Sequence, residues 1–315
     1  MAVCAIYLFI LINFCYTDKV HDLCAKMKYY HVYTKGLEDD VIFLDREDFV
    51  VGMNYVAIAC FQCQVTILAF VLMSNHFHFI IYSSRSDAER FIRLYKQMIS
   101  HYIRLKYGKV AFLQRVAASC DEVSPMDDGL KRCIAYVLDN PVKAGLFCVP
   151  QGYEWGSAGC YFSDIHSVDE GTPVTGYSVR ELKRILHSGA RLDDSFRISS
   201  AGYIDPRSYV DYTAVEEIFG RPKSFEFFLS TSASSRRAKR DVIMFSDDLV
   251  RDAMNEVLRS KYGLSVSEDL TEDVKIMLIK DIRSCFNAPA NQIARVVGCS
   301  VRFVVQTLGI CSVII

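Results

Sequence analysis

The sequence predicts an α+β fold in which helices cover an antiparallel sheet, followed by an all-helical C-terminal module. Two observations predict it. Between residues 29 and 107, segments of strand-like and helical apolar spacing follow in the order strand, helix, strand, strand, helix. From residue 242 to the end, the apolar spacing is helical. A chain of 315 residues has room for two such domains.

The first strand and helix are indicated by their side-chain patterns. Residues 29–34 alternate between aromatic and β-branched types and end at Gly36, which is typical of a strand followed by a turn. Residues 46–63 read "REDFVVGMNYVAIACFQC" and place apolar side chains at helical spacing.

A hairpin with two histidines is expected next. Residues 66–73 and 76–83 are apolar strands joined by Ser74-Asn75, and the second strand carries His76 and His78. Side chains two apart on a strand point to the same face. Taken alone, the pair is compatible with two half-buried histidines on a polar sheet face or with two imidazoles directed at one metal ion.

The following segment predicts a long amphipathic helix with a basic surface. Residues 87–108 have helical spacing and end at a glycine, and Tyr95 and Tyr102 are interleaved with cations. Such a run is often only a solvated face. A run of one sign with aromatic rings, lying beside a candidate metal site, also suits a phosphate backbone with stacked bases, and we favour nucleic acid as its partner. The cations, with no acidic residue among them, are Arg90, Arg93, Lys96, Arg104, Lys106, Lys109 and Arg115.

A further helix is predicted between residues 124 and 140, where Pro141 stops it. Tyr136 and Asn140 are four residues apart, so they lie on one helical face. By themselves they are also consistent with a half-buried tyrosine and an asparagine cap. The segment 150–162, "PQGYEWGSAGCYF", holds the one tryptophan and is expected to be a packing loop.

Bulk properties narrow the classes of protein. The net charge is −1, so a nucleic-acid partner must be held by local patches. The twelve cysteines form no disulfide framework and indicate reduced thiols in the cytoplasm. Cys60 and Cys63 form a CxxC, which we interpret as two core thiols, with a structural zinc site as the alternative.

The two ends of the chain carry separate expectations. Residues 1–26 begin with "MAVCAIYLFILINFCY", which is short for a membrane span and lacks a basic signal-peptide region, so we interpret them as an extension upstream of a start at Met27 rather than an anchor. Residues 166–240 are expected to be a connecting region with a basic, Ser-rich linker. Residues 241–315 are expected to form the helical module. Within it, residues 288–309 show two helical patterns around Gly298-Cys299-Ser300, the layout of a helix-turn-helix or of a small helical bundle.

Four blocks together resemble a known family. "YYHVYTKG", "AFVLMSNHFHFIIYS", "YVLDNPVKAGL" and "YEWGSAGCY", within residues 28–162, resemble the REP-associated tyrosine transposases, a branch of the single-tyrosine HUH (insertion-sequence 200-like) transposases. The resemblance implies a ferredoxin-like HUH domain over residues 27–165. It also implies an enzyme that cleaves and rejoins single-stranded DNA, often at hairpin-forming repeats, through a 5′-phosphotyrosine.

The resemblance also implies residue roles. His76, His78 and Asn140 would hold a divalent metal, Mg²⁺ or Mn²⁺, and Tyr136 would be the nucleophile; Tyr102, on the basic helix, is the competing nucleophile candidate. From charge alone, DNA contacts are expected from Arg90, Arg93, Lys96, Arg104, Lys106 and Arg115.

Alternatives to an active transposase remain at this point. One is an inactive or domesticated relative that only binds DNA through the C-terminal helices. Another is a plasmid or phage replication initiator with the same chemistry, against which the "NPVKAG" block counts. We expect a monomer or homodimer in the cytoplasm, with no membrane partner.

Overall fold

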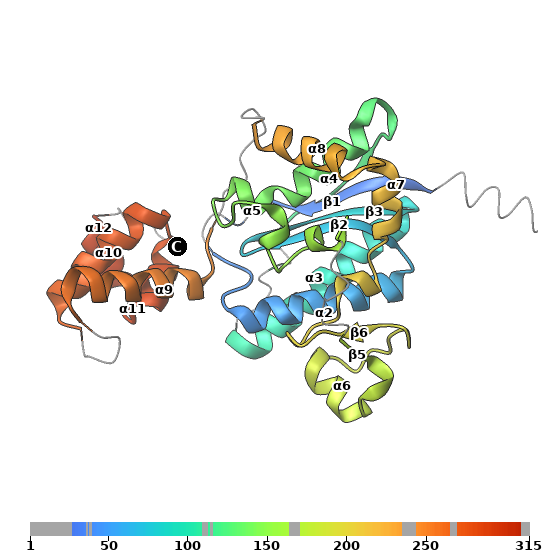
Figure 1. The fold of residues 1–315 in the computed structure, drawn as a ribbon. Helices are drawn as coiled ribbons and strands as arrows, with labels where there is room; N and C mark the ends of the chain where they lie inside the picture. Colours follow the sequence, from blue (N-terminus) through green and yellow to red (C-terminus); the bar gives the residue numbers. More distant parts are fainter. Residues whose placement is uncertain are drawn as a thin grey trace, which may run out of the picture.

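The fold is a four-stranded antiparallel sheet with helices on both faces, joined to a helical C-terminal region (Figure 1). The computed structural model describes residues 27–309 apart from 36, 38–39, 109–112, 114–115, 164–170, 235–243 and 265–269. The predicted N-terminal extension and the basic linker around residues 236–240 lie outside the described residues.

The sheet domain has the ferredoxin-like βαββαβ order. Its elements are β1 (Lys28–Thr34), α2 (Arg46–Cys63), β2 (Thr66–Met73), β3 (His76–Ser83), α3 (Arg85–Tyr107) and β4 (Ala118–Val123). The strands lie side by side in the order β2-β3-β1-β4, and each neighbouring pair is antiparallel. The predicted α+β, ferredoxin-like fold is therefore confirmed.

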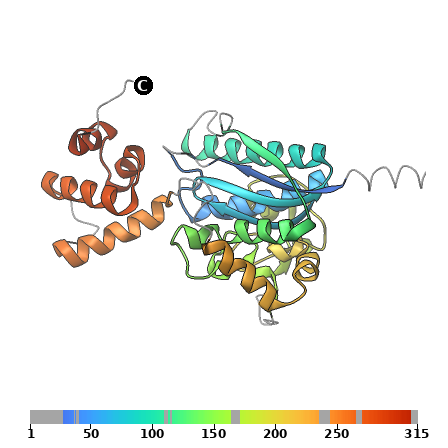
Figure 2. The same cartoon turned by 90° about the horizontal axis from the view of Figure 1, so that it is seen from above.

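The two faces of the sheet carry different side chains. On β3, Phe77 and Phe79 face α3, where their rings pack edge-on against Tyr95 at 4.9 and 5.3 Å. Helices α2 and α3 cover this face, while α4 (Gly129–Leu138) and α8 (Pro222–Ser234) lie over the other one (Figure 2). The alternation of β3 therefore directs His76 and His78 toward the α4 side.

Strand β4 was not predicted. Its sequence, ASCDEV, is short, charged and half exposed, so the apolar alternation that indicates a strand is missing. It pairs with the edge of β1, where His31 lies opposite Asp121. The pairing places this carboxylate on the same face as the histidines.

The opposite edge of the sheet is covered by the tryptophan loop. Leu72 N donates to Trp155 O at 2.8 Å, and Ser157 N donates to Phe70 O at 3.0 Å, so the loop continues the ladder of β2. The Trp155 ring stacks on Phe49 with centroids 5.0 Å apart. The expected packing loop is confirmed, and it also protects an edge strand.

The predicted connecting region contributes to the core of the sheet domain. Its buried side chains include Leu186, Val215 and Phe225, in one cluster with the strands. Asn54 Nδ2 donates to Ile185 O at 3.1 Å, and Tyr55 OH donates to His187 O at 3.1 Å. The described elements here are β5 (Thr172–Pro173), α6 (Val179–Leu186), β6 (Arg197–Ile198), α7 (Tyr212–Phe219) and α8.

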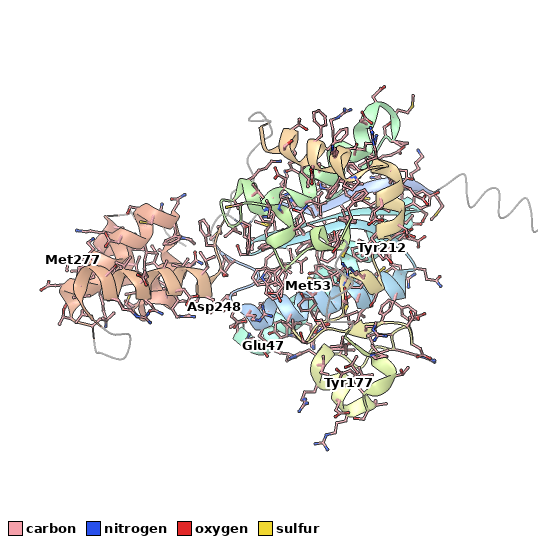
Figure 3. The ribbon with its side chains drawn as sticks, in the orientation of Figure 1. Glu47, Met53, Tyr177, Tyr212, Asp248 and Met277 are labelled. Atoms are coloured by element: carbon pink, nitrogen blue, oxygen red, sulfur yellow. The ribbon has the colours of Figure 1, made fainter. Side chains whose placement is uncertain are left out.

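The C-terminal region has its own hydrophobic cluster, built from side chains between Val250 and Val304. Its helices are α9 (Asp247–Val257), extended by a π-turn (Leu258–Tyr262), α10 (Glu272–Phe286), α11 (Ala290–Val297) and α12 (Val301–Leu308). It contacts the sheet domain where Arg46 N donates to Asp248 Oδ2 at 3.0 Å, beside Glu47 in Figure 3.

None of the helices over residues 27–309, gaps excepted, combines the length and apolar character that a membrane-spanning helix requires.

Candidate active site

The two histidines of β3 lie on the sheet face under α4, and both side chains are buried, at 0% and 1% exposure. Their rings are 5.1 Å apart and nearly perpendicular. Phe77 between them points to the opposite face. The alternation expected from the sequence therefore holds, and it brings the two imidazoles to one place.

Asn75 fixes which nitrogen of His76 carries the proton. Its Nδ2 donates to Leu37 O at 2.8 Å, and because a carbonyl only accepts, the Asn75 amide must be oriented with Oδ1 on the other side. That oxygen lies 2.8 Å from His76 Nδ1. Since Oδ1 only accepts, Nδ1 of His76 carries the hydrogen, and in the neutral ring Nε2 keeps the lone pair that a metal ligand needs.

Helix α4 carries Tyr136 to the same face. Its apolar stripe, which includes Leu130, Ile134 and Leu138, is buried against the sheet. Tyr136 is half buried, and its ring meets the His78 ring edge-on with centroids 5.8 Å apart. The structure thus brings together the predicted nucleophile and the predicted histidine pair.

Asn140 follows the end of α4 and begins the short helix α5 (Asn140–Lys143). Its Nδ2 donates to Tyr136 O at 2.9 Å and to Val137 O at 3.1 Å. Both acceptors are carbonyls, so the amide orientation is fixed and Oδ1 is the atom directed away from the helix end. The side chain is buried one turn after Tyr136, as the four-residue spacing predicts.

Lys143 is a further cation at Tyr136. Its Nζ lies 4.5 Å from the centroid of the Tyr136 ring. It is held there by Asp139 Oδ2 at 3.5 Å and by Ser232 Oγ of α8 at 3.0 Å. A fixed ammonium at this position can stabilise negative charge that develops beside the phenol.

Strand β1 adds residues that sequence reasoning missed. His31 Nε2 lies 3.0 Å from His78 Nδ1, and the His31 ring is 6.0 Å from that of Tyr136. Tyr33 stacks on His31 at 4.5 Å and donates its hydroxyl to Asp121 Oδ2 at 3.0 Å. The signal was present in "YYHVYTKG", where His31 and Tyr33 alternate onto one strand face, but their pairing with β3 is not visible in the sequence.

His78 is suited in charge to hold a divalent cation. Burial, with the nearby charges of His76, His31 and Lys143, holds the pKa of His78 well below its usual range, so the ring is neutral at pH 7. A ligating imidazole must be neutral. No group of three or more His, Cys, Asp or Glu side chains in the described part of the chain is arranged for a metal, so the expected set depends on the Asn140 oxygen as its third donor.

The basic helix lies on the other face of the sheet from these residues. Phe91 and Tyr95 of α3 pack on Phe79, on the face opposite the histidines. Our interpretation of the basic run as adjacent to the metal site is therefore wrong in its geometry. Arg90, Arg93 and Arg104 are exposed there. Arg115 lies outside the described residues.

Two lysines of the run are engaged inside the protein. Lys106 Nζ lies 2.8 Å from both Asp45 Oδ2 and Asp48 Oδ1 and 2.9 Å from Glu47 Oε2. Burial opposes its charge, but hydrogen bonds to these carboxylates hold the pKa of Lys106 well above its usual range. Lys96 Nζ donates to Val116 O at 2.5 Å. Neither ammonium is placed as a surface contact for phosphate.

Tyr102 is also separated from the histidine pair by the sheet. Its hydroxyl donates to Asp48 Oδ1 at 3.0 Å, and the side chain is buried. Burial and the charge of Asp48 raise the pKa of Tyr102 well above its usual range. This environment disfavours the phenolate that a nucleophile requires.

The CxxC cysteines lie in the hydrophobic core, as predicted. Cys60 Sγ donates to Val65 O at 3.1 Å, and burial raises the pKa of Cys60 to about 12. A thiol in such surroundings resists becoming the thiolate that zinc binds.

The C-terminal helices have the two-helix layout expected from the sequence. Gly298 ends α11 with a positive φ of 70°, and Ser300 caps α12 by accepting from Phe303 N. The arginines of these two helices differ in exposure and pairing. Arg302 on α12 is exposed, whereas Arg295 on α11 is paired with Asp247 at 2.7 Å.

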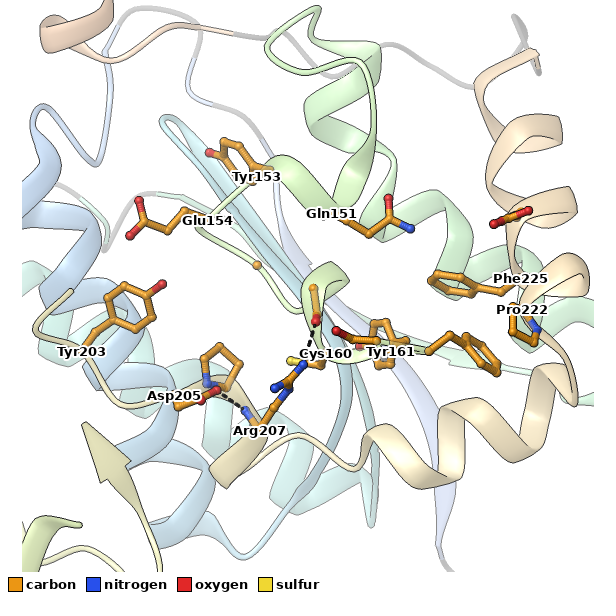
Figure 4. Close-up of a pocket in the computed structure, with 16 residues that line it drawn as sticks. Gln151, Tyr153, Glu154, Cys160, Tyr161, Tyr203, Asp205, Arg207, Pro222 and Phe225 are labelled. Atoms are coloured by element: carbon orange, nitrogen blue, oxygen red, sulfur yellow. Dashed lines mark hydrogen bonds between the residues drawn. The ribbon is translucent and has the colours of Figure 1, made fainter. Parts of the chain in front are cut away.

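A pocket of about 530 Å³ opens elsewhere, between the tryptophan loop and α8 (Figure 4). Arg207 lies in it, with Nη2 3.4 Å from Gly159 O, but Glu154, Asp205 and Glu226 also line it. This excess of carboxylates disfavours a phosphate backbone, and neither the histidines nor Tyr136 line the pocket.

Comparisons with known proteins add one likeness. No family model matches the sequence, and no curated protein matches it. A solved structure of a REP-associated tyrosine transposase bound to a REP hairpin is similar to 43% of this chain and 78% of its own, with 15% identity and a TM-score of 0.35. Because a TM-score this low reflects only a loose likeness, we base the function on the residues of this chain.

Proposed function

We propose that this protein cleaves and rejoins single-stranded DNA, using Tyr136 as the nucleophile, as a transposase of the single-tyrosine HUH type. The observation that supports it best is the edge-on approach of Tyr136 to His78, at 5.8 Å between centroids, on a sheet face that also carries His76. A nucleophile beside two buried imidazoles is an arrangement suited to attack on a phosphodiester held by a metal.

The reaction forms one bond and breaks another. Tyr136 Oη attacks phosphorus and loses its proton, while the bond from phosphorus to the 3′ oxygen breaks and that oxygen leaves as a 3′-hydroxyl. The products are a 5′-phosphotyrosine and a free 3′ end. Because the phosphodiester bond energy is retained in the covalent intermediate, a 3′-hydroxyl can attack it and rejoin strands without a nucleotide cofactor.

His76, His78 and Asn140 are the residues that would hold Mg²⁺ or Mn²⁺, through the two Nε2 atoms and the amide oxygen. Such an ion would polarise the non-bridging oxygens of the scissile phosphate. Lys143 holds positive charge 4.5 Å from the centroid of the Tyr136 ring, which favours loss of the proton from the phenol.

The test is incubation of the full chain with hairpin-bearing single-stranded DNA labelled 3′ of the cut, in Mn²⁺, followed by a denaturing gel. Sequences flanking the gene are the first substrates. We expect a labelled protein adduct from the wild type, none from Tyr136→Phe, none in excess chelator, and a strong loss in His76→Ala.

Tyr102→Phe is the matched control, because it removes a hydroxyl on the opposite side of the sheet. It should leave the adduct in place at normal yield. Loss of the adduct in Tyr102→Phe alone would contradict the assignment of Tyr136 and move the nucleophile to α3.

A protein that binds DNA without cutting it is the second candidate. It is favoured by the α11–α12 arrangement, with its turn at Gly298 and exposed Arg302. Binding of flanking DNA without an adduct, across several hairpin substrates, would support this candidate over the enzyme.

A further inference from the structure

The contact between His31 and His78 has a counterpart at His76. Each histidine of β3 has its Nδ1 at hydrogen-bond distance from a polar atom of a neighbouring side chain: Asn75 Oδ1 at 2.8 Å for His76, and His31 Nε2 at 3.0 Å for His78. For His76, the partner is an oxygen that only accepts, so the tautomer is determined. For His78, the partner is another imidazole, and the direction of the hydrogen bond depends on the tautomer of His31.

The packing of His31 holds its ring in one orientation. Tyr33 stacks on it with an interplanar angle of 26°, and the Tyr33 hydroxyl is anchored on Asp121 Oδ2. The His31 and His78 rings lie nearly parallel, at 21°, with centroids 5.2 Å apart. A ring fixed in this way keeps its Nε2 directed at His78 Nδ1.

We propose that His31 is a positioning residue, whose Nε2 accepts the Nδ1 hydrogen of His78 and so leaves the lone pair of His78 on Nε2. The reverse hydrogen bond would place the His78 proton on Nε2 and block the atom that has to bind a cation. An acceptor on the far nitrogen of a ligating histidine fixes its tautomer and ring orientation. His31 would thus do for His78 what Asn75 does for His76.

This inference rests on the proposed function in assigning His78 as a ligand, but its test needs neither DNA nor cleavage. The chain has seven histidines, so ¹⁵N-histidine labelling and long-range ¹H–¹⁵N correlation can resolve each ring, with His78→Gln identifying its signals. In metal-free wild type, we expect His78 to carry its hydrogen on Nδ1. A hydrogen on Nε2 would overturn the inference without any further variant.

Variants of His31 provide the second measurement. His31→Phe keeps an aromatic ring for Tyr33 to stack on and removes the acceptor, whereas His31→Gln can place its Oε1 near the former Nε2. We expect His31→Phe to shift His78 toward the Nε2–H tautomer. It should also weaken Mn²⁺ binding about 10- to 100-fold, as measured by electron paramagnetic resonance. His31→Gln should stay within about 3-fold of the wild type, because it restores an acceptor.

His101→Phe is the matched control, since His101 is exposed on α3 and is bonded to Arg104 rather than to the site. It should alter neither the His78 tautomer nor Mn²⁺ binding. Equal Mn²⁺ affinity in His31→Phe and His101→Phe would overturn the inference. A failure of the proposed function can be distinguished from a failure of this inference, because it would be seen as the absence of the covalent DNA adduct.

Discussion

Lys106 is expected to be a stability determinant and not a DNA contact, and Lys106→Met tests this directly. Its ammonium makes contacts of 2.8–2.9 Å with three carboxylates, and one of them, Asp48, has a fully buried side chain. Truncating the cation leaves Asp48 charged in the interior beside Asp45. Removing one partner of a buried ion pair costs about 3–5 kcal/mol.

Two features of the structure lower the expected cost of removing Lys106. Lys106 itself is 23% exposed, and Asp48 keeps hydrogen bonds from Leu44 N at 2.7 Å and from Tyr107 OH. We therefore expect Lys106→Met to lower the free energy of unfolding by about 2–4 kcal/mol at pH 7. Arg104→Met, two residues earlier and exposed, should change it by less than about 0.5 kcal/mol.

The loss should also depend on pH. Burial raises the pKa of Asp48 in the folded protein, so folding favours its protonated form and the native state gains stability as the pH falls through this raised pKa. Without Lys106 that pKa rises further, and a neutral Asp48 no longer needs a cation. Urea unfolding at pH 7 and pH 5 should show the gap between Lys106→Met and wild type narrowing at pH 5.

Lys106→Met/Asp48→Asn should likewise recover part of the loss, because the double variant removes the uncompensated charge. The reasoning is refuted if the free energy of unfolding of Lys106→Met lies within about 0.5 kcal/mol of that of Arg104→Met, or if its deficit grows as the pH falls.

Three further predictions concern the site and the basic helix. Asn75→Ala should weaken Mn²⁺ binding about 10- to 100-fold, measured by electron paramagnetic resonance, because it frees the tautomer of His76; unchanged affinity would contradict the assigned hydrogen bond. Lys143→Met should slow adduct formation by on the order of 10²-fold in single-turnover gels, while the conservative Lys143→Arg retains most of the rate; equal rates for Met and wild type would remove Lys143 from the mechanism. If α3 contacts single-stranded DNA, Arg90, Arg93 and Arg104 changed together to Gln should reduce the slope of log affinity against log salt by about 2, with adduct formation at saturating protein unchanged; a lost adduct would show that α3 acts at the active site.

The sequence predicts the sheet domain well where side-chain alternation and helical spacing are strong. Helix α2 and strands β2 and β3 have the bounds that were expected, because their apolar patterns are long and end at clear turns. Strand β4 was missed because Asp121 and Glu122 interrupt its alternation, although pairing with β1 stabilises it. Long-range pairing of this kind overrides weak local propensity.

The sequence of α2 already indicated that a further segment, which the structure shows to lie within residues 166–240, packs against this helix. Its side chains are apolar almost all round, which is typical of a helix covered on several sides. The structure provides that cover with the segment at Ile185 and His187, which accepts from Asn54 and Tyr55. A prediction that treats residues 166–240 as a linker does not explain why α2 is buried on several sides.

At the candidate site, the spacing of residues within one strand or helix predicted which side chains share a face. The sequence did not show which elements pair with each other. His76 and His78, or Tyr136 and Asn140, share a face through the periodicity of one strand or one helix. His31 enters through the register of β1 against β3, in which Tyr33 lies opposite His78. The side of the sheet that α3 covers also depends on packing, which is why its cations were placed beside the histidines by mistake.

The most direct test of the account is to locate the residue that becomes joined to DNA. The full chain is reacted with hairpin single-stranded DNA in Mn²⁺, digested with nuclease and protease, and the nucleotide-bearing peptide is sequenced by tandem mass spectrometry. We predict that the wild type carries a nucleotide joined through its 5′-phosphate to Tyr136, and that Tyr136→Phe carries no such nucleotide. A modified Tyr102, or any other residue carrying the nucleotide in the wild type, would contradict the proposed active site.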